Sequence, residues 1–157
     1  MAENQPRKTV SVTTVEVVFP QHTNHYGPLF GGTLLSWIDK IGFYAVARYC
    51  GRPAVTVAVE GIDFTVPLMV GDQVELEARI IHTGKTSMVV RVQVFKSDMY
   101  GHDAPVLATT GYFTYVSIDE NRAPLNVPPL MIETTEEKSL FKLGAEMRNQ
   151  ALTRRSN

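Results

Sequence analysis

The run from Phe30 to Tyr49 constrains the possible fold more than any other part of the chain. Its apolar residues recur every three or four positions, which predicts a helix, and they form two stripes rather than one. The stripes are Leu34, Ile38, Ile41 and Ala45, and Leu35, Gly42, Phe43 and Val46. A helix that is apolar on two sides must be covered by other parts of the protein over most of its surface.

Five stretches of the sequence are typical of β-strands, one before this helix and four after it. They cover residues 9–19, 54–64, 72–82, 87–97 and 106–118. Two of them alternate cleanly between apolar and polar residues, which indicates a sheet with one face in water. Short turns separate the last four, so neighbouring strands are expected to be antiparallel. The alternation changes phase at Glu60-Gly61, which indicates a β-bulge there.

The order of these elements predicts an α+β fold, in which a curved antiparallel sheet of five or six strands wraps one long helix. We expect residues 1–9 to be disordered, residues 10–120 to form the domain, and residues 121–157 to form a linker and a C-terminal helix. Thr134 and Glu137 match a capping box at the start of that helix. Few of its residues are apolar, so we expect it on a surface or against a partner chain.

Composition argues against several classes of function. The net charge of −1 gives no basic surface for nucleic acid. No apolar run is long enough to span a bilayer, and the polar N-terminal residues lack the apolar segment of a signal peptide. The single cysteine, Cys50, cannot form an intrachain disulfide and favours a reducing compartment. We therefore expect a cytoplasmic protein that binds neither nucleic acid nor membrane.

Asp39 is the one acid inside the apolar helix. Its neighbours one turn away are Leu35, Ser36, Gly42 and Phe43. Because they offer little solvation, the carboxylate suits a general base or a nucleophile. The structural alternative is an ion pair with Lys40, or a place at a solvent-facing edge of the helix.

The start of the helix and the loop before it also carry candidate residues. Gly31 and Gly32 stand where free backbone N–H groups and the helix dipole can stabilise an oxyanion, although a tight turn also explains them. Asn24 can hydrogen-bond a carbonyl or a water, but the commoner role of such an Asn is in a turn. His22 and His25 flank Asn24 without further ligands at a suitable spacing, so no metal site is expected.

The turn "HTGKTS" at residues 82–87 offers backbone N–H groups, one cation and two hydroxyls. Its candidate residues are Gly84, Lys85, Thr86 and Ser87. This combination suits contact with a phosphate. The alternative is an ordinary hairpin turn with a solvated lysine. It is not a nucleotide P-loop, because no helix follows it.

Taken together, these motifs resemble the hotdog-fold acyl-CoA thioesterases, and more narrowly the acyl-CoA hydrolase branch of bacteria and of the tandem-domain cytosolic hydrolases of animals. The most specific motif is N-x-x-G-x-x-F-G-G-x(6)-D, from Asn24 to Asp39. The run "RPAVTVAVEGIDFTVPLMVGD" and the later "GKTS" and "ATTGYFTYVSID" also fit. The resemblance covers Val10 to Ser117. It implies a helix wrapped by a curved sheet, pairing into homodimers and often hexamers (trimers of dimers), with active sites at the dimer interface.

The resemblance also implies roles for individual residues. Asp39 would act as general base or nucleophile in thioester hydrolysis, and Asn24 of the other subunit would orient the water or the carbonyl. Backbone N–H groups near Gly31 and Gly32 would stabilise the oxyanion, and Thr56 would hold a water.

A second group of residues would bind the substrate, which itself carries the coenzyme A, so that no separate cofactor is implied. The CoA phosphates would contact Arg52, Gly84, Lys85, Thr86 and Ser87. Apolar walls would come from Trp37, Phe43 and Phe64.

Two departures from the family pattern are His22, where an acid or another polar residue is common, and Glu60, where Asp is common. Two other functions fit a hotdog fold. A hydratase or dehydratase would place a histidine such as His25 beside Asp39. A non-catalytic acyl-CoA sensor would carry a DNA-binding segment, for which the C-terminal helix lacks a basic recognition face.

Overall fold

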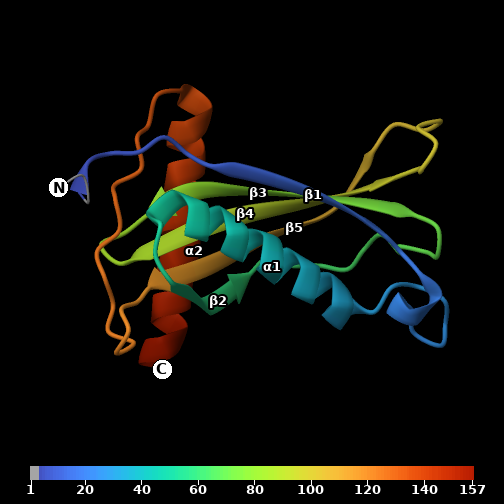
Figure 1. Cartoon of the computed structure of the whole chain (residues 1–157), viewed down its shortest axis with the longest axis horizontal. Helices are drawn as coiled ribbons and strands as arrows, with labels where there is room; N and C mark the ends of the chain where they lie inside the picture. Colours follow the sequence, from blue (N-terminus) through green and yellow to red (C-terminus); the bar gives the residue numbers. More distant parts are fainter. Residues whose placement is uncertain (1–3) are drawn as a thin grey trace.

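The computed structural model describes residues 4–157, in which one curved antiparallel sheet separates two helices (Figure 1). The strands are β1 (Ser11–Val17), β2 (Ala54–Glu60), β3 (Gln73–Thr83), β4 (Ser87–Ser97) and β5 (Val106–Ser117). Their order in the sheet is β1-β3-β4-β5-β2, so β1 and β2 are the edges. A short 3-10 turn, η2 (Pro20–His22), leads toward the first helix. The predicted hotdog architecture is confirmed, with five strands in the part of the chain described.

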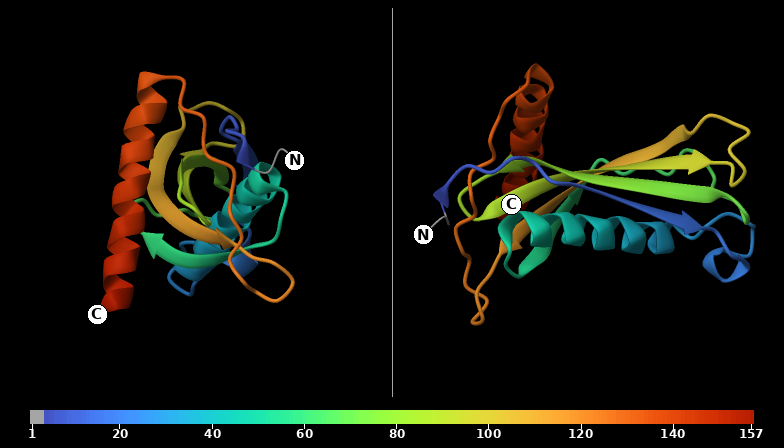
Figure 2. Two further views of the ribbon diagram at one scale, coloured as in Figure 1. Left: turned by 90° about the vertical axis from the view of Figure 1, so that its left-hand side faces the viewer. Right: turned by 45° about the horizontal axis from the view of Figure 1, so that its top comes forward.

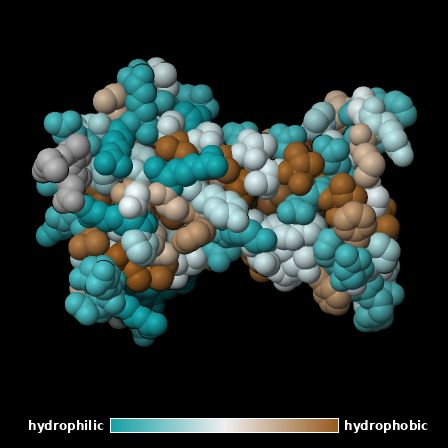
Figure 3. Space-filling model, viewed as in Figure 1, coloured by the Kyte–Doolittle hydropathy of each residue, from teal (hydrophilic) through white to brown (hydrophobic). Residues whose placement is uncertain are grey.

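The first helix, α1 (Gly31–Cys50), lies in the hollow of the sheet (Figure 2). The side chains of Ile38, Ile41 and Ala45 are almost fully buried there, which accounts for the first apolar stripe. The second stripe is covered less than expected, since Phe43 is 43% exposed in the single chain. Apolar side chains show as brown patches on the face along which α1 runs (Figure 3).

Strand β2 differs from the sequence prediction in two respects. The strand ends at Glu60, because Gly61 takes a left-handed backbone conformation with φ of +70°. The irregularity in its pairing with β5 lies between Thr56 and Ala58, earlier than the predicted bulge at residues 60–61. A bulge re-aims the side chains next to it, so its position bears directly on the direction of Thr56.

The second helix, α2 (Thr135–Ser156), packs on the outer face of the sheet (Figure 2). The predicted capping box is confirmed, since the Thr134 hydroxyl accepts from the backbone N–H of Glu137 at 3.0 Å and the Glu137 carboxylate accepts from that of Thr134. Gly144 lets the helix approach β3 closely, because a Cβ at this position would overlap the Cβ of His82. The helix therefore covers its own chain's sheet.

The N-terminal segment is only partly as predicted. Residues 1–3 of the segment expected to be disordered lie outside the described residues. Arg7, however, pairs with Leu130 in a short parallel bridge and donates a hydrogen bond to the carbonyl of Tyr49 at 2.7 Å. The Thr9 hydroxyl donates to the carbonyl of Ile80 at 2.6 Å. Among the described residues, neither helix has both the length and the apolarity that crossing a membrane requires.

Candidate functional site

Asp39 projects from α1 toward the sheet, and two hydroxyl groups converge on one of its carboxylate oxygens. The Thr56 hydroxyl donates to Oδ1 at 2.7 Å, and the Tyr115 hydroxyl lies 3.0 Å from the same oxygen and 2.9 Å from the Asp39 carbonyl. No hydrogen bond reaches Oδ2 from the described residues. No ion pair joins Asp39 to Lys40 among the described residues either, so the structural alternative of a surface salt bridge finds no support.

The two hydroxyl donors form a cross-strand pair. Thr56 on β2 stands directly opposite Tyr115 on β5, and the bulge of β2 follows immediately after Thr56. Residues opposite each other in an antiparallel pair share one face of the sheet, here the face toward α1. The backbone register thus places both donors at one point along the helix, where Asp39 meets them.

Gly42 and Tyr115 fit together at this point. A Cβ at Gly42, one turn along α1 from Asp39, would overlap the Tyr115 hydroxyl, so only glycine leaves room for it. Tyr115 is fully buried. Burial raises its pKa well above the ordinary value, and the neighbouring Asp39 carboxylate adds to the shift. Tyr115 therefore stays protonated and acts as a fixed hydrogen-bond donor.

Asn24 lies in the loop before α1, and its backbone and side-chain oxygen are held by that loop. The side-chain oxygen accepts from the backbone N–H of Tyr26 at 2.8 Å, and the backbone N–H of Asn24 donates to the Pro28 carbonyl at 2.9 Å. The predicted turn role is thus correct. This role does not use all the hydrogen-bonding groups of the side chain, because the turn leaves the two N–H donors of the amide for another partner.

A cavity of about 360 Å³ adjoins Asn24 and the start of α1. Gly31 borders it, and the ring of Phe64 lies against Gly31 at about 3.4 Å from where a Cβ would stand. The first backbone N–H groups of a helix have no partner within the helix, so those of Gly31 and Gly32 can receive a hydrogen-bond acceptor. The cavity therefore combines an amide donor, a helix N-terminus and apolar walls.

The structure thus forms two groups of candidate residues rather than one. Asn24 and Gly31 lie together at the start of α1, and Asp39 and Thr56 lie together farther along it. From Gly31 to Asp39 the helix rises by about 12 Å. One chain therefore does not bring Asn24 to Asp39 by itself.

The other predicted wall residues lie elsewhere. Trp37 packs edge-on against the His22 ring with the ring centroids 5.2 Å apart. Phe43 lies on the exposed side of α1, beside Tyr44. Only Phe64 of the three lines the cavity beside Asn24.

The predicted CoA-binding turn lies on the opposite face of the sheet from Asp39. Ser87 pairs with Val116, which follows the inward-facing Tyr115 and so points outward. Ser87 is buried, and its hydroxyl accepts from Nε of Arg148 at 2.9 Å, whereas Lys85 is exposed.

The remaining members of that group have structural partners or line a second cavity. The backbone N–H of Gly84 donates to the Ser87 carbonyl at 2.9 Å, as in an ordinary hairpin turn. Thr86 and Ser87 line a cavity beneath α2. Arg52 donates to the Asn126 carbonyl at 3.2 Å, and the next residue, Val127, donates through its backbone N–H to the Lys85 carbonyl of the turn at 2.9 Å.

Sequence reasoning missed Tyr115, which contacts Asp39, and it missed Arg148 and Arg155, which line the cavity beneath α2. The signal for Tyr115 was its place on the inward face of a strand, because a buried tyrosine hydroxyl usually needs a partner. The signal for the arginines was weaker. They stand two turns apart on one face of a polar helix, a pattern that a solvated surface also produces.

Comparison with known proteins agrees with the fold and the motif. Residues 26–101 match the family model of the Thioesterase superfamily. A Bacillus subtilis protein named as an uncharacterized acyl-CoA thioester hydrolase is 36% identical over 148 residues, covering 94% of this chain and 86% of its own length. A Zymomonas mobilis protein with the same kind of name is 37% identical over 114 residues, covering 73% of this chain and 76% of its own.

Solved structures give the same result. The acyl-CoA hydrolase of Staphylococcus aureus, in complex with butyryl coenzyme A, coenzyme A and coenzyme A disulfide, superposes with a TM-score of 0.84 at 31% identity, covering 92% of this chain and 88% of its own. A hexameric acyl-CoA thioesterase superposes with a TM-score of 0.84 at 33% identity, covering 92% of each chain.

The Staphylococcus aureus protein has also been solved with single alanine replacements of one asparagine, one aspartate and one threonine. These three residues follow one another at the same spacing along that chain as Asn24, Asp39 and Thr56 do here. The sequence identity, the shared fold and the family model lead to one conclusion: the chain belongs to the thioesterase superfamily, among the hotdog-fold acyl-CoA thioester hydrolases.

Proposed function

We propose that this protein hydrolyses fatty acyl-CoA to a free fatty acid and CoA, with Asp39 as the reacting carboxylate. The observation that carries the proposal is the arrangement around Asp39. Two hydroxyl donors bind Oδ1 and fix the carboxylate, which leaves Oδ2 as the oxygen that accepts a proton or attacks carbon. A general base must hold its acceptor oxygen in a defined direction, and this geometry does so.

The hydrolytic step then follows from the chemistry of these groups. Oδ2 of Asp39 takes a proton from a water whose oxygen attacks the thioester carbonyl carbon. The carbonyl oxygen becomes an oxyanion, which the N–H groups near Gly31 and Gly32 stabilise; since these groups lie with Asn24 and away from Asp39 in one chain, the second subunit supplies them. The intermediate collapses, the C–S bond breaks, and the CoA sulfur leaves as a thiolate that takes up a proton. If Asp39 attacks directly, water instead hydrolyses the resulting mixed anhydride.

In this proposal Asn24 comes from a second subunit, because the two groups of candidate residues lie apart in one chain. Its free amide N–H groups orient the thioester carbonyl or the water. The exposed apolar side of α1 and the open edge of β2 supply the contact surface between subunits. We propose a homodimer as the smallest active unit and a hexamer of three such pairs as the assembly. A cytoplasmic location stays a prediction.

The first experiment measures thiol release from acyl-CoAs of two to sixteen carbons by wild type and by Asp39→Asn. We expect turnover by wild type and a loss of about 10²–10⁴-fold in kcat in the variant. Asp103→Asn, the same change at an exposed acid between β4 and β5, is the matched control and should keep full activity. A folded, oligomeric Asp39→Asn protein with wild-type kcat would refute the role of Asp39.

A mixing experiment tests whether the site is shared. Inactive Asn24→Ala and Asp39→Ala subunits are combined by denaturing and refolding them together. In a mixed pair one site carries both changes and the other carries neither, so random mixing should restore about a quarter of wild-type activity. No recovery, in mixed oligomers that have been verified by mass, would place both residues in the same subunit's site.

The competing hydratase or dehydratase function has little support in the geometry. The His25 ring lies against Tyr26 in a tilted arrangement with the ring centroids 3.9 Å apart, and the hydrogen bonds to Asp39 from the described residues come from Thr56 and Tyr115. A sensor without activity would bind the acyl-CoAs of the panel and cleave none of them, so the same assay decides between these functions.

A further inference from the structure

The chain leaves the sheet after Glu60, the last residue of β2, and the segment that follows forms part of the cavity beside Asn24. Nine residues line this cavity, and four of them come from the segment: Phe64, Val66, Pro67 and Leu68. All four are apolar, and the ring of Phe64 lies against the start of α1. The shape of the cavity therefore depends on where residues 61–68 lie.

Few contacts hold this segment in place. Residues 61–66 form no backbone hydrogen bond with the rest of the described chain. At the far end, the Leu68 carbonyl accepts from the backbone N–H of Leu29 at 2.7 Å. Between the ends, Ile62 fills the space beside Gly111, where an added Cβ would overlap its side chain. The position of the segment therefore depends on its two ends and on apolar packing between them.

The end of the segment at β2 is fixed by the C-terminal helix. Glu60 forms an ion pair with Arg154 in the last turn of α2, which packs on the outer face of the sheet. The Glu60 side chain is only 10% exposed, whereas that of Arg154 is 57% exposed. Oε1 of Glu60 is buried, and among the described residues it has no hydrogen-bond partner of regular geometry. The guanidinium of Arg154 is therefore the group that compensates this buried carboxylate.

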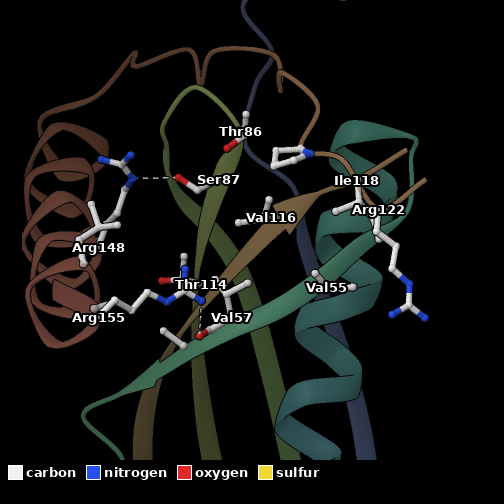
Figure 4. A pocket seen from close by; sticks show the side chains of 14 residues that line it. Val55, Val57, Thr86, Ser87, Thr114, Val116, Ile118, Arg122, Arg148 and Arg155 are labelled. Atoms are coloured by element: carbon white, nitrogen blue, oxygen red, sulfur yellow. Dashed lines mark hydrogen bonds between the residues drawn. The ribbon is translucent and has the colours of Figure 1, made fainter. Parts of the chain in front are cut away.

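The neighbouring Arg155 shows what is particular to Arg154. Arg155 donates through Nη2 to the Val57 carbonyl at 3.2 Å, within β2 (Figure 4). That contact joins α2 to the body of the strand, whereas Arg154 binds the residue at which the cavity segment begins. The partial negative charge at the C-terminus of a helix favours both arginines, so it does not account for the pairing of one of them with a buried carboxylate.

We propose that the ion pair between Glu60 and Arg154 positions residues 61–68 and thereby sets how long an acyl chain the cavity beside Asn24 accepts. The assignment of an acyl chain to this cavity rests on the proposed function, and its apolar walls suit such a ligand. A buried carboxylate that loses its cation moves toward water, because an uncompensated buried charge is costly. That movement would carry the start of the segment with it and withdraw Phe64 from the cavity. Neither member of the pair lines the cavity, so both are positioning residues.

The kinetic test compares acetyl-CoA with the longest acyl-CoA that wild type hydrolyses, in wild type, Glu60→Gln and Arg154→Gln. We expect the KM for the long substrate to rise about tenfold in both variants, the size expected when about two methylene groups lose their apolar contact. The kcat and the KM for acetyl-CoA should stay constant, because a two-carbon acyl group does not reach the displaced wall. Arg154→Lys keeps the charge and should keep the wild-type preference.

Arg155→Gln is the matched control, because it removes the neighbouring contact between α2 and β2. It should leave the ratio of the two KM values at its wild-type value. The double variant Glu60→Gln/Arg154→Gln should lose no more selectivity than the worse of the two single variants, since both act through one contact. Losses that multiply, or equal changes for the long and the short substrate, would show a merely structural role and overturn the proposal. All variants are compared as folded oligomers of verified mass.

A binding test separates this proposal from the hydrolytic function. It uses calorimetry with S-alkyl thioethers of CoA, from ethyl to hexadecyl, which carry the alkyl chain but cannot be hydrolysed. We expect the Kd of the tightest-binding long thioether to rise about tenfold in Glu60→Gln and Arg154→Gln, while that of the ethyl thioether stays constant. This pattern in a protein that cleaves no acyl-CoA would refute the hydrolase and support the role of the pair. Variants that bind every thioether as wild type does, or a wild type that binds none, would refute the role of the pair.

Discussion

Helices α1 and α2 are nearly equal in length, with 20 and 22 residues, yet the sheet holds them in different ways. The inner helix buries a continuous row of apolar side chains. It carries one acid, and hydroxyl groups of the sheet fix the position of that acid. The outer helix is polar, and its buried residues are only Leu140, Gly144 and Ala151. A continuous apolar contact suits a group that must not move, whereas a sparse one leaves space for a cavity between helix and sheet.

One glycine in each helix allows the two helix–sheet contacts to be compared by mutation. The missing Cβ of Gly42 in α1 leaves space for the hydroxyl of Tyr115, and that of Gly144 in α2 leaves space for His82. A methyl group at either position would push its helix away from the sheet. Only at Gly42 would that movement also disturb the hydrogen bonds to Asp39.

The largest effect is expected from Gly42→Ala. The added methyl group displaces the Tyr115 hydroxyl, so we expect a loss of about 1–3 kcal/mol in the free energy of unfolding together with a drop of about 10²-fold in kcat. Urea unfolding and thiol release measure the two effects. Wild-type kcat in this variant would mean that Tyr115 does not position Asp39.

Gly144→Ala should separate stability from activity. We expect a comparable loss of about 1–3 kcal/mol, because the methyl group would overlap the Cβ of His82, but kcat should stay close to wild type. Gly32→Ala is the stability control, since nothing lies within 4 Å of its added Cβ. Equal losses of kcat at Gly42 and Gly144 would show that both helices move together with the site.

Tyr115→Phe removes one hydrogen bond and leaves the ring packing in place. We expect kcat to fall about tenfold and the free energy of unfolding to fall by about 1 kcal/mol, the usual size for such a bond. Thr56→Val removes the second donor to the same oxygen. Because both donors fix one carboxylate, the double variant should lose less activity than the two single losses multiplied together.

The smallest effect concerns His82, which lies under α2. Burial lowers its pKa, although its hydrogen bond with the Phe141 carbonyl at 3.1 Å acts in the opposite direction. A lowered pKa in the folded state means that the stability it supports is present above the unfolded value of about 6.5 and is lost as the pH falls through the folded value. Between pH 7 and pH 5 the Tm of wild type should therefore fall more than that of His82→Gln. Parallel curves would contradict this.

The sequence predicted what depends on local pattern. The first apolar stripe of α1, the alternation of β3 and β4 and the capping box at Thr134 each follow from periodicity or from a short motif, and the structure confirms them. The motif from Asn24 to Asp39 marked the site through family resemblance. Neither kind of signal contains the distance between two segments.

What the sequence did not show depends on register. Tyr115 meets Asp39 only because β2 and β5 pair with Thr56 opposite it, and the shift in that register lies at a place the alternation did not reveal. The cavity beneath α2 depends in the same way on how a polar helix crosses the sheet. Sequence pattern leaves such a helix free to face water, so its arginines looked like surface residues.

The separation of Asn24 from Asp39 within one chain has a consequence for how the protein works in dilute solution. If Asn24 and Asp39 meet only across a pair of subunits, a newly made chain holds both halves of a site and no whole one. Hydrolysis would then depend on the concentration at which subunits associate. Because the concentration of dimers in dilute solution grows with the square of the protein concentration, specific activity would rise in proportion to protein concentration before levelling off. Single chains would then be inactive, and assembly would be the step that activates the hydrolysis of acyl thioesters.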